Sequence, residues 1–243
     1  MILVKLNAIN STNTYLKQLA KKLDTISWTV VTAEFQTLGR GQLHNKWVSD
    51  KGKNLICSIL IRFYDLKIKN QFYLNCAVSL GIYDALNNYN LPQLKIKWPN
   101  DIMSVSKKMV GILIENSLKK DYIHQSVVGI GLNINQVTFP STLVNAISMK
   151  QILDVEVDRD QLLTRIVASI KTQIEILNNN GFNLLHANYE KSLFKKDEAQ
   201  MFEDHQHHKF MGKILGITKS GMLIVAHENQ MIKEYNFKEI KFL

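Results

Sequence analysis

Residues 28–47 read WTVVTAEFQTLGRGQLHNKW, an apolar and β-branched run followed by a loop with two glycines. The run at 28–33 predicts a buried strand that delivers the loop, residues 34–47, to the protein surface. Gly39 and Gly41 allow backbone N–H groups to approach an anion at little steric cost. The stretch is either an anion-binding loop or a basic surface loop with a hydrophobic plug, and a lone glycine-rich loop does not decide between them.

The side chains of this loop favour negatively charged ligands. Arg40 stands between the two glycines, and a guanidinium binds a carboxylate or phosphate through two hydrogen bonds. Lys46 adds a second cation a few residues later, directly before Trp47. The loop therefore predicts a site for an anion if the rest of the chain supplies the walls.

The chain has 243 residues, enough for one large domain or for a large and a small one. No apolar run reaches the roughly 18 residues that span a bilayer, and residues 1–5 are too short for a secretory signal. We therefore expect a globular protein of the cytoplasm without a membrane partner. Cys57 and Cys76 fall in a predicted strand and a predicted helix, which favours buried free thiols over a disulfide.

The net charge of +9 favours a negatively charged partner or ligand. Nucleic acid is one such partner. However, the lysines are scattered along the chain, and no helix-turn-helix pattern precedes the first strand. Direct DNA binding is therefore not expected.

Hydrophobic periodicity divides the first part of the chain into alternating strands and helices. Ser11, Thr12 and Asn13 are capping residues for a first helix with the apolar pattern Tyr15, Leu16, Leu19 and Leu23. The longest helix is predicted at 158–180 and ends at Gly181. The other expected strands are 2–7, 54–62, 94–101, 109–115 and 126–135, and the other expected helices are 73–89 and a shorter one through 184–193.

Polar residues and glycines at the ends of these elements are candidate ligand contacts. Asn100 and Asp101 follow a proline at a strand end, where they form either a bare turn or a ligand-facing pair. Gly129 and Gly131 lie two apart in a strand and leave a flat floor for a ligand ring or a crossing backbone. Gly111, in the preceding strand, likewise suggests the close approach of another group.

The composition changes at about Phe194, where a charged and polar segment, 194–208, begins. Beyond it, three short alternating runs at 209–217, 222–226 and 231–237 predict a small antiparallel β module. We therefore divide the chain into domains 1–193 and 194–243. The histidines at 205, 207 and 208 are interpreted as part of a solvated turn rather than as metal ligands.

The order and spacing of five motifs resemble those of the biotin protein ligases, and the match covers almost the whole chain. The motifs are Ser-Thr-Asn at 11–13, Gly-Arg-Gly through Lys-Trp at 39–47, Lys-Trp-Pro-Asn-Asp at 97–101, Lys-x-x-Gly-Ile-Leu at 108–113 and Gly-x-Gly-x-Asn at 129–133.

The resemblance implies an α/β fold in which a mixed-sheet, class II synthetase-like catalytic domain precedes a small SH3-like β-barrel. It implies two steps: biotin and MgATP form biotinyl-5′-AMP, and a lysine of a biotin carboxyl carrier domain of a biotin-dependent carboxylase then takes the biotin. Some family members carry an N-terminal DNA-binding domain; this chain starts at the first strand of the catalytic domain, so we expect a ligase only, as a monomer or homodimer.

The resemblance also implies residue roles. Lys108 and Arg40 are the expected catalytic residues, because cations must offset the repulsion between the biotin carboxylate and the ATP α-phosphate. The expected biotin contacts are Ser11, Thr12, Asn13, Gln36, Gly39, Arg40, Gly41, Gln42, Lys108, Gly111, Gly129 and Gly131. The expected ATP or adenylate contacts are Arg40, Lys46, Trp47, Asn100, Asp101, Lys108 and Asn133. Of these, Asn100, Asp101 and Asn133 are expected to face the adenylate or its Mg²⁺.

This chain departs from the family in the glycine loop. Many members have Gly-Arg-Gly-Arg-Arg-Gly-Arg-Lys-Trp, whereas Gln42, Leu43, His44 and Asn45 here remove three charges and one glycine. Loop closure is therefore expected to depend on Arg40, Lys46 and Trp47.

Three other functions compete with a biotin ligase. A lipoate-type ligase would share the fold and the chemistry, but its Arg-Arg-x-x-Gly-Gly-Gly pattern is not found. A non-catalytic binding module would need neither Lys108 nor the glycine loop. A nucleic-acid-binding protein would use the positive charge.

Overall fold

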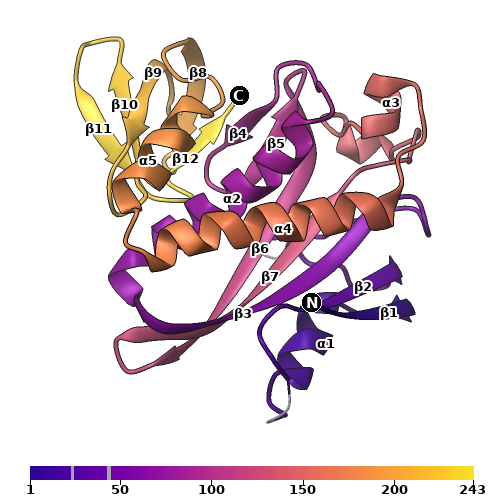
Figure 1. The fold of residues 1–243 in the computed structure, drawn as a ribbon. Coiled ribbons are helices and arrows are strands. Elements are labelled where there is room, and N and C mark those ends of the chain that lie inside the picture. Colours follow the sequence, from indigo (N-terminus) through magenta and orange to yellow (C-terminus); the bar gives the residue numbers. More distant parts are fainter. Residues whose placement is uncertain (23–24, 43–44) are drawn as a thin grey trace.

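The computed structural model describes residues 1–22, 25–42 and 45–243, which form two β-sheets and the helices that pack on the larger one (Figure 1). Leu23 of the first helix pattern and Leu43 and His44 of the glycine loop lie outside the described residues.

The larger sheet has seven strands in the order β1-β2-β3-β7-β6-β5-β4. β1 runs parallel to β2, and the pairs that follow across the sheet are antiparallel, so the predicted mixed sheet is confirmed. The strands are β1 (Ile2–Ile9), β2 (Thr29–Gln36), β3 (Leu55–Lys67), β4 (Lys95–Lys97), β5 (Asp101–Ser104), β6 (Lys107–Lys119) and β7 (Tyr122–Leu132).

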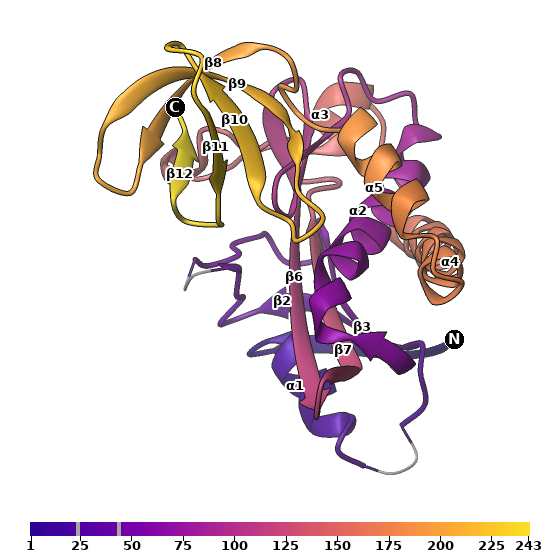
Figure 2. The same ribbon diagram turned by 90° about the vertical axis from the view of Figure 1, so that its left-hand side faces the viewer.

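The two faces of this sheet have different partners. Alternate residues of β3 point to opposite faces. Ile59 and Ile61 belong to the main core with the long helices, whereas Leu60 packs with Leu16 of α1. Figure 2 shows α2, α4 and α5 together on one side of the sheet, away from the glycine loop. The helices are α1 (Thr12–Leu19), α2 (Gln71–Asn87), α3 (Met149–Leu153), α4 (Arg159–Asn178) and α5 (Phe182–Lys191), and short 3-10 turns lie at Ile68–Asn70 and Ser141–Leu143.

The second sheet has five strands in the order β11-β10-β9-β8-β12. Its strands are β8 (Ala199–Asp204), β9 (Lys209–Ile217), β10 (Leu223–His227), β11 (Ile232–Tyr235) and β12 (Ile240–Phe242). All its pairs are antiparallel, and residues 194–243, which are fully described, contain no ladder between β11 and β12 that would close a barrel.

Several elements differ from the sequence-based expectation. The polar segment 194–208 contains strand β8, because Phe202 alone is fully buried while its neighbours face outward. Lys108 lies within β6, which begins two residues before the expected strand 109–115, since the hairpin turns at Val105 and Ser106. Helix α3 was not predicted; it has only five residues, too few for a periodic signal.

The first helix is capped as predicted, with the Ser11 side chain accepting from Thr14 N. In the described part of the chain, no helix combines the length and the apolar character needed to cross a membrane. Cys57 and Cys76 are buried free thiols, also as predicted. Burial raises the pKa of the Cys57 thiol to about 12, so this thiol stays protonated and unreactive.

Candidate active site

A cavity of about 800 Å³ lies on the face of the large sheet opposite α2 and α4. Its walls come from the glycine loop, the start of α1, strands β6 and β7, and the end of the second sheet. Every residue that the sequence selected as a biotin or adenylate contact lines this cavity except Gly39 and Asn133. Segments separated by more than two hundred residues therefore meet at one place.

The floor of the cavity is built from glycines that face each other across two strands. Gly111 of β6 pairs with Gly131 of β7, and Leu113 pairs with Gly129 one row further along. The indole of Trp47 lies over the first row: a Cβ on Gly131 would come within 2.6 Å of Trp47 Cδ2, and one on Gly111 within 3.0 Å of Cζ3. The flat floor thus carries a side chain of the glycine loop, an occupant that the sequence did not suggest.

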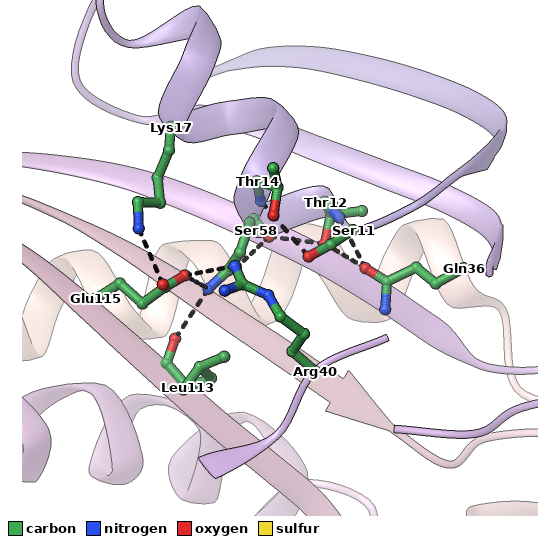
Figure 3. Close-up of polar contacts among 10 residues, drawn as sticks. Ser11, Thr12, Thr14, Lys17, Gln36, Arg40, Ser58, Leu113 and Glu115 are labelled. Carbon is green, nitrogen blue, oxygen red and sulfur yellow. Dashed lines mark hydrogen bonds and ion pairs between the residues drawn. The ribbon is translucent and has the colours of Figure 1, made fainter. Parts of the chain in front are cut away.

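Asn13 covers the second row, against Gly129. Ser58 joins Asn13 to a polar network with Thr12 and Gln36. Figure 3 shows Ser58, Thr12 and Gln36 of this network. Gln36 Oε1 accepts from Thr12 N at 2.7 Å and from Thr12 Oγ1 at 3.0 Å, and Ser58 Oγ lies 2.7 Å from Thr12 Oγ1. Tight networks of this kind fix the orientation of the groups that line a polar pocket.

Lys108 and Asp101 form an ion pair of 2.7 Å at the other end of the floor. The ammonium of Lys108 would lie 3.4 Å from a Cβ on Gly111, so it sits beside the first row, and it is 6.0 Å from the centre of a Trp47 ring. Both groups are partly exposed to the cavity, at 38% for the Lys108 side chain and 23% for that of Asp101. A cation in this position can meet an anionic ligand directly.

The second sheet closes the cavity on one side. Phe237, Lys238, Ile240, Lys241 and Phe242 all line it, and the sequence did not predict any of these contacts. Phe242 and Phe237 contact Lys97 and Trp98 of the motif at 97–101 in the large sheet.

Lys97 and Trp98 hold the two sheets together at the cavity wall. Trp98 Nε1 donates to the Gly221 carbonyl at 2.9 Å, and the Lys97 ammonium lies 4.6 Å from the centre of the Phe242 ring. Burial lowers the pKa of Lys97, the nearby Asp101 carboxylate counteracts this, and the charge of Lys108 lowers it further. Lys97 is thus a partly desolvated cation near Lys108.

Residues of the glycine loop form one wall of the cavity. Gln42 Oε1 and Trp47 Nε1 are buried and have no hydrogen-bond partner within the described ranges 1–22, 25–42 and 45–243. Both residues line the cavity, and each of these unpaired atoms is itself shielded from solvent.

Hydrogen bonds within the protein explain the positions of Gly39, Asn100 and Asn133 without a ligand. The Gly39 carbonyl accepts from Trp47 N at 3.0 Å, and Asn100 Nδ2 donates to the Ile112 carbonyl at 2.6 Å. Asn133 donates from Nδ2 to the Ile147 carbonyl at 3.3 Å and lies outside the cavity lining. Their roles as ligand contacts stay predictions.

No group of three or more metal-ligating side chains forms a cluster within the described residues. His207 and His208 pair instead with Glu203 and Asp204, at 3.0 and 3.5 Å, and their side chains are mostly exposed. These contacts fit the solvated turn expected from the sequence.

Gly131→Ala is expected to displace the Trp47 indole from the floor, because the new methyl group would overlap ring atoms. Acrylamide should then quench tryptophan fluorescence more strongly than in the wild type. Gly41→Ala is the matched control: its added methyl group meets only ordinary contacts, the nearest atom being Asn45 O at 3.4 Å. Unchanged quenching in a folded Gly131→Ala protein would contradict this placement of Trp47.

The sequence profile of the biotin/lipoate A/B protein ligase family matches residues 6–133, more than half of the chain. Among curated proteins, the bifunctional ligase/repressor BirA of Bacillus subtilis is 29% identical over 214 residues, which cover 86% of this chain and 64% of the relative. A biotin--[acetyl-CoA-carboxylase] ligase of Mycobacterium tuberculosis is 28% identical over 168 residues, covering 68% of this chain and 60% of the relative. The chain thus spans less than two thirds of the length of these relatives.

A solved structure is similar over its whole length. The biotin protein ligase from Aquifex aeolicus in complex with biotin and ATP aligns with a TM-score of 0.81 and 27% identity, covering 100% of this chain and 98% of that one. The two-sheet arrangement of this chain is therefore also found in a solved protein.

Proposed function

The chain belongs to the biotin/lipoate A/B protein ligase family, and on that premise we propose that it activates biotin with MgATP and transfers it to a lysine of a biotin carboxyl carrier domain. The observation that carries the proposal is the single cavity in which the glycine loop, the glycine floor and Lys108 meet. The reaction would take place in the cytoplasm, with the enzyme as a monomer or homodimer.

In the first step, an oxygen of the biotin carboxylate attacks the α-phosphorus of ATP. The bond from that phosphorus to the bridging oxygen breaks, and pyrophosphate leaves with the electron pair. Because two anions must come within bonding distance, fixed cations that face the cavity lower the barrier. Lys108 is the main candidate, and Arg40 is the second.

In the second step, the neutral amine of the carrier lysine attacks the acyl carbon of biotinyl-5′-AMP. The acyl–oxygen bond breaks, AMP leaves with the electron pair, and the amine loses a proton as the amide forms. Water would hydrolyse the same anhydride, so a loop that covers the cavity preserves the intermediate. We expect the glycine loop, with Arg40 and Trp47, to do this.

The chemistry of the cavity suits the proposed ligands. Its volume lies in the ordinary range for small-molecule sites. A ureido ring presents both N–H and C=O groups, which Gln42 Oε1 and Trp47 Nε1, buried and unpaired among the described residues, would complement once the loop exposes them. Two further cations from the second sheet, Lys238 and Lys241, add to the positive potential for a triphosphate.

Mg²⁺ would arrive with ATP. Asp101 is the one carboxylate that lines the cavity in the described part of the chain, and it is paired with Lys108. Magnesium bound to nucleotides takes one or two carboxylates together with phosphate oxygens, and this donor set fits that mode rather than a protein cage.

The acyl group is what separates this proposal from a lipoate-type ligase. Incubation with MgATP, a biotin carrier domain and equimolar biotin and lipoate should add one biotin per carrier, as intact mass shows. A carrier with its acceptor lysine replaced by arginine is the control. Addition of lipoate instead of biotin would overturn the proposed substrate.

We further propose that the second sheet serves adenylate handling or carrier docking and does not bind DNA. In residues 194–243, all of which are described, the regular elements are strands, so this region offers no helix to enter a major groove. A gel-shift assay with random duplex DNA at physiological salt should show no tight complex. A tight, salt-sensitive complex would contradict the proposal.

A further inference from the structure

Glu115 of β6 is surrounded by hydrogen-bond donors from two other segments (Figure 3). Its Oε2 accepts from Asn13 Nδ2 at 2.8 Å and pairs with a terminal nitrogen of Arg40 at 3.1 Å. Its Oε1 accepts from Lys17 Nζ at 2.9 Å. One carboxylate therefore carries two cations, of which one comes from α1 and one from the glycine loop.

The position of Glu115 on the floor separates Arg40 from Lys108. Because side chains alternate along a strand, Glu115 faces the same side as Gly111 and Leu113. It lies four residues beyond Gly111, or about 13 Å along the strand. Lys108 lies beside Gly111, so the guanidinium of Arg40 is held at the far end of the floor from the other candidate catalytic cation.

Arg40 lies between two pockets. It lines both the main cavity and a smaller outer pocket of about 570 Å³, whereas Glu115 lines only the outer pocket. The Arg40 side chain therefore borders both spaces. The Arg40 side chain is 44% exposed, which leaves it room to move.

Glu115 would not be left without a partner after such a move. Lys17 and Asn13 would still hold both oxygens of the carboxylate. Burial alone would raise the pKa of Glu115, but hydrogen bonds from Lys17 and Asn13 and the charge of Arg40 outweigh it and lower the pKa. The carboxylate is thus ionised at neutral pH and attracts Arg40 in competition with a ligand anion.

We propose that Glu115 is a positioning residue that holds Arg40 at the outer end of the floor in the ligand-free chain. When the acyl-adenylate binds, Arg40 leaves Glu115 and pairs with the phosphate of the ligand instead. Lys17 makes the exchange favourable by remaining as the counter-ion of Glu115. This proposal rests on the proposed function, because the competing anion is the adenylate. Partly exposed ion pairs are weak, so a ligand can break this one.

The exchange predicts opposite effects for two neutral substitutions. Glu115→Gln keeps the side-chain shape but removes the competing charge, so biotinyl-5′-AMP should bind about two- to fivefold more tightly. Lys17→Gln leaves Arg40 as the remaining cation on Glu115, so binding should weaken by a similar factor. Both effects should vanish in an Arg40→Gln background, because nothing is then exchanged.

Isothermal titration with biotinyl-5′-AMP measures these affinities, and thermal unfolding confirms that each variant is folded. A purely structural role for Glu115 would weaken binding in both substitutions and in both backgrounds. That result, or unchanged affinity in Glu115→Gln, overturns the exchange while leaving the proposed function standing. If Glu115→Gln does not fold, Lys17→Gln alone tests the exchange. The expected result is that Lys17→Gln weakens the binding of biotinyl-5′-AMP in the wild-type background but not in the Arg40→Gln background. Failure of the wild-type protein to bind biotinyl-5′-AMP overturns both proposals.

Discussion

Replacing Lys108 with alanine is expected to slow adenylate formation by about 10²- to 10³-fold, which corresponds to roughly 2.7–4 kcal/mol of barrier. The lysine ammonium lies beside Gly111, within 6.0 Å of the centre of a Trp47 ring on the floor of the cavity. The fold should stay intact, because the backbone of residue 108 keeps its hydrogen bonds to Asn145 and Ile147. Biotin-dependent exchange of pyrophosphate into ATP measures the rate.

Lys107→Ala is the matched control for this substitution. Lys107 is the neighbouring residue of β6 and points to the opposite side, where it is exposed. It should retain the wild-type exchange rate. If Lys108→Ala exchanges pyrophosphate as fast as Lys107→Ala does, Lys108 is not the catalytic cation.

Arg40→Gly is expected to release biotinyl-5′-AMP into solution and so to biotinylate bystander proteins. Gln42, Leu43, His44 and Asn45 stand where many family members carry three more charges and a glycine, so closure of the loop over the adenylate is expected to depend on Arg40, Lys46 and Trp47. Loss of a hydrogen bond to a charged group should speed escape of the adenylate about ten- to a hundredfold. A streptavidin blot with excess albumin, at matched rates of adenylation, detects the freed intermediate.

Lys51→Gly removes a cation from an exposed turn just beyond the loop and serves as the control. It should label albumin no more than the wild type does. Equal and negligible labelling by Arg40→Gly and Lys51→Gly would mean that Arg40 does not retain the adenylate.

Local patterns were sufficient to predict the long elements. The apolar stripe of α4 packs mainly on α2 and to a lesser extent on β3, with Ile166 and Ile170 fully buried. The alternating glycines of β7 do face one side of the sheet, as their spacing of two implied. The prediction failed where the signal was too short, as in α3, or where one buried residue among polar neighbours defined a strand, as in β8.

The sequence predicted the residues of the site that belong to motifs, but not the residues outside the motifs. Residues that belong to motifs gather at one cavity, but the residues that orient them do not belong to any. Glu115 and Asn13 are 102 residues apart in sequence, and no local period connects them. Likewise, the contribution of Phe242 and Lys241 depends on how the second sheet packs, which periodicity within a strand does not encode.

The position of Trp47 shows the same limit. The spacing of Gly129 and Gly131 required that something approach the sheet closely, and it left a ligand ring or a crossing backbone as the choices. The structure places an indole over Gly131 and an amide over Gly129. Both come from segments that the sequence had already selected for other reasons, so the residues were predicted and their arrangement was not.

Pyrophosphate release by the purified chain, measured with MgATP in the presence and absence of biotin, tests the proposed function most directly. We predict that biotin stimulates release, and that stimulation is lost in Lys108→Ala but kept in Lys107→Ala. Pyrophosphate release that does not depend on biotin, or none at all from a folded protein, would contradict the assignment of this cavity as a biotin-activating site.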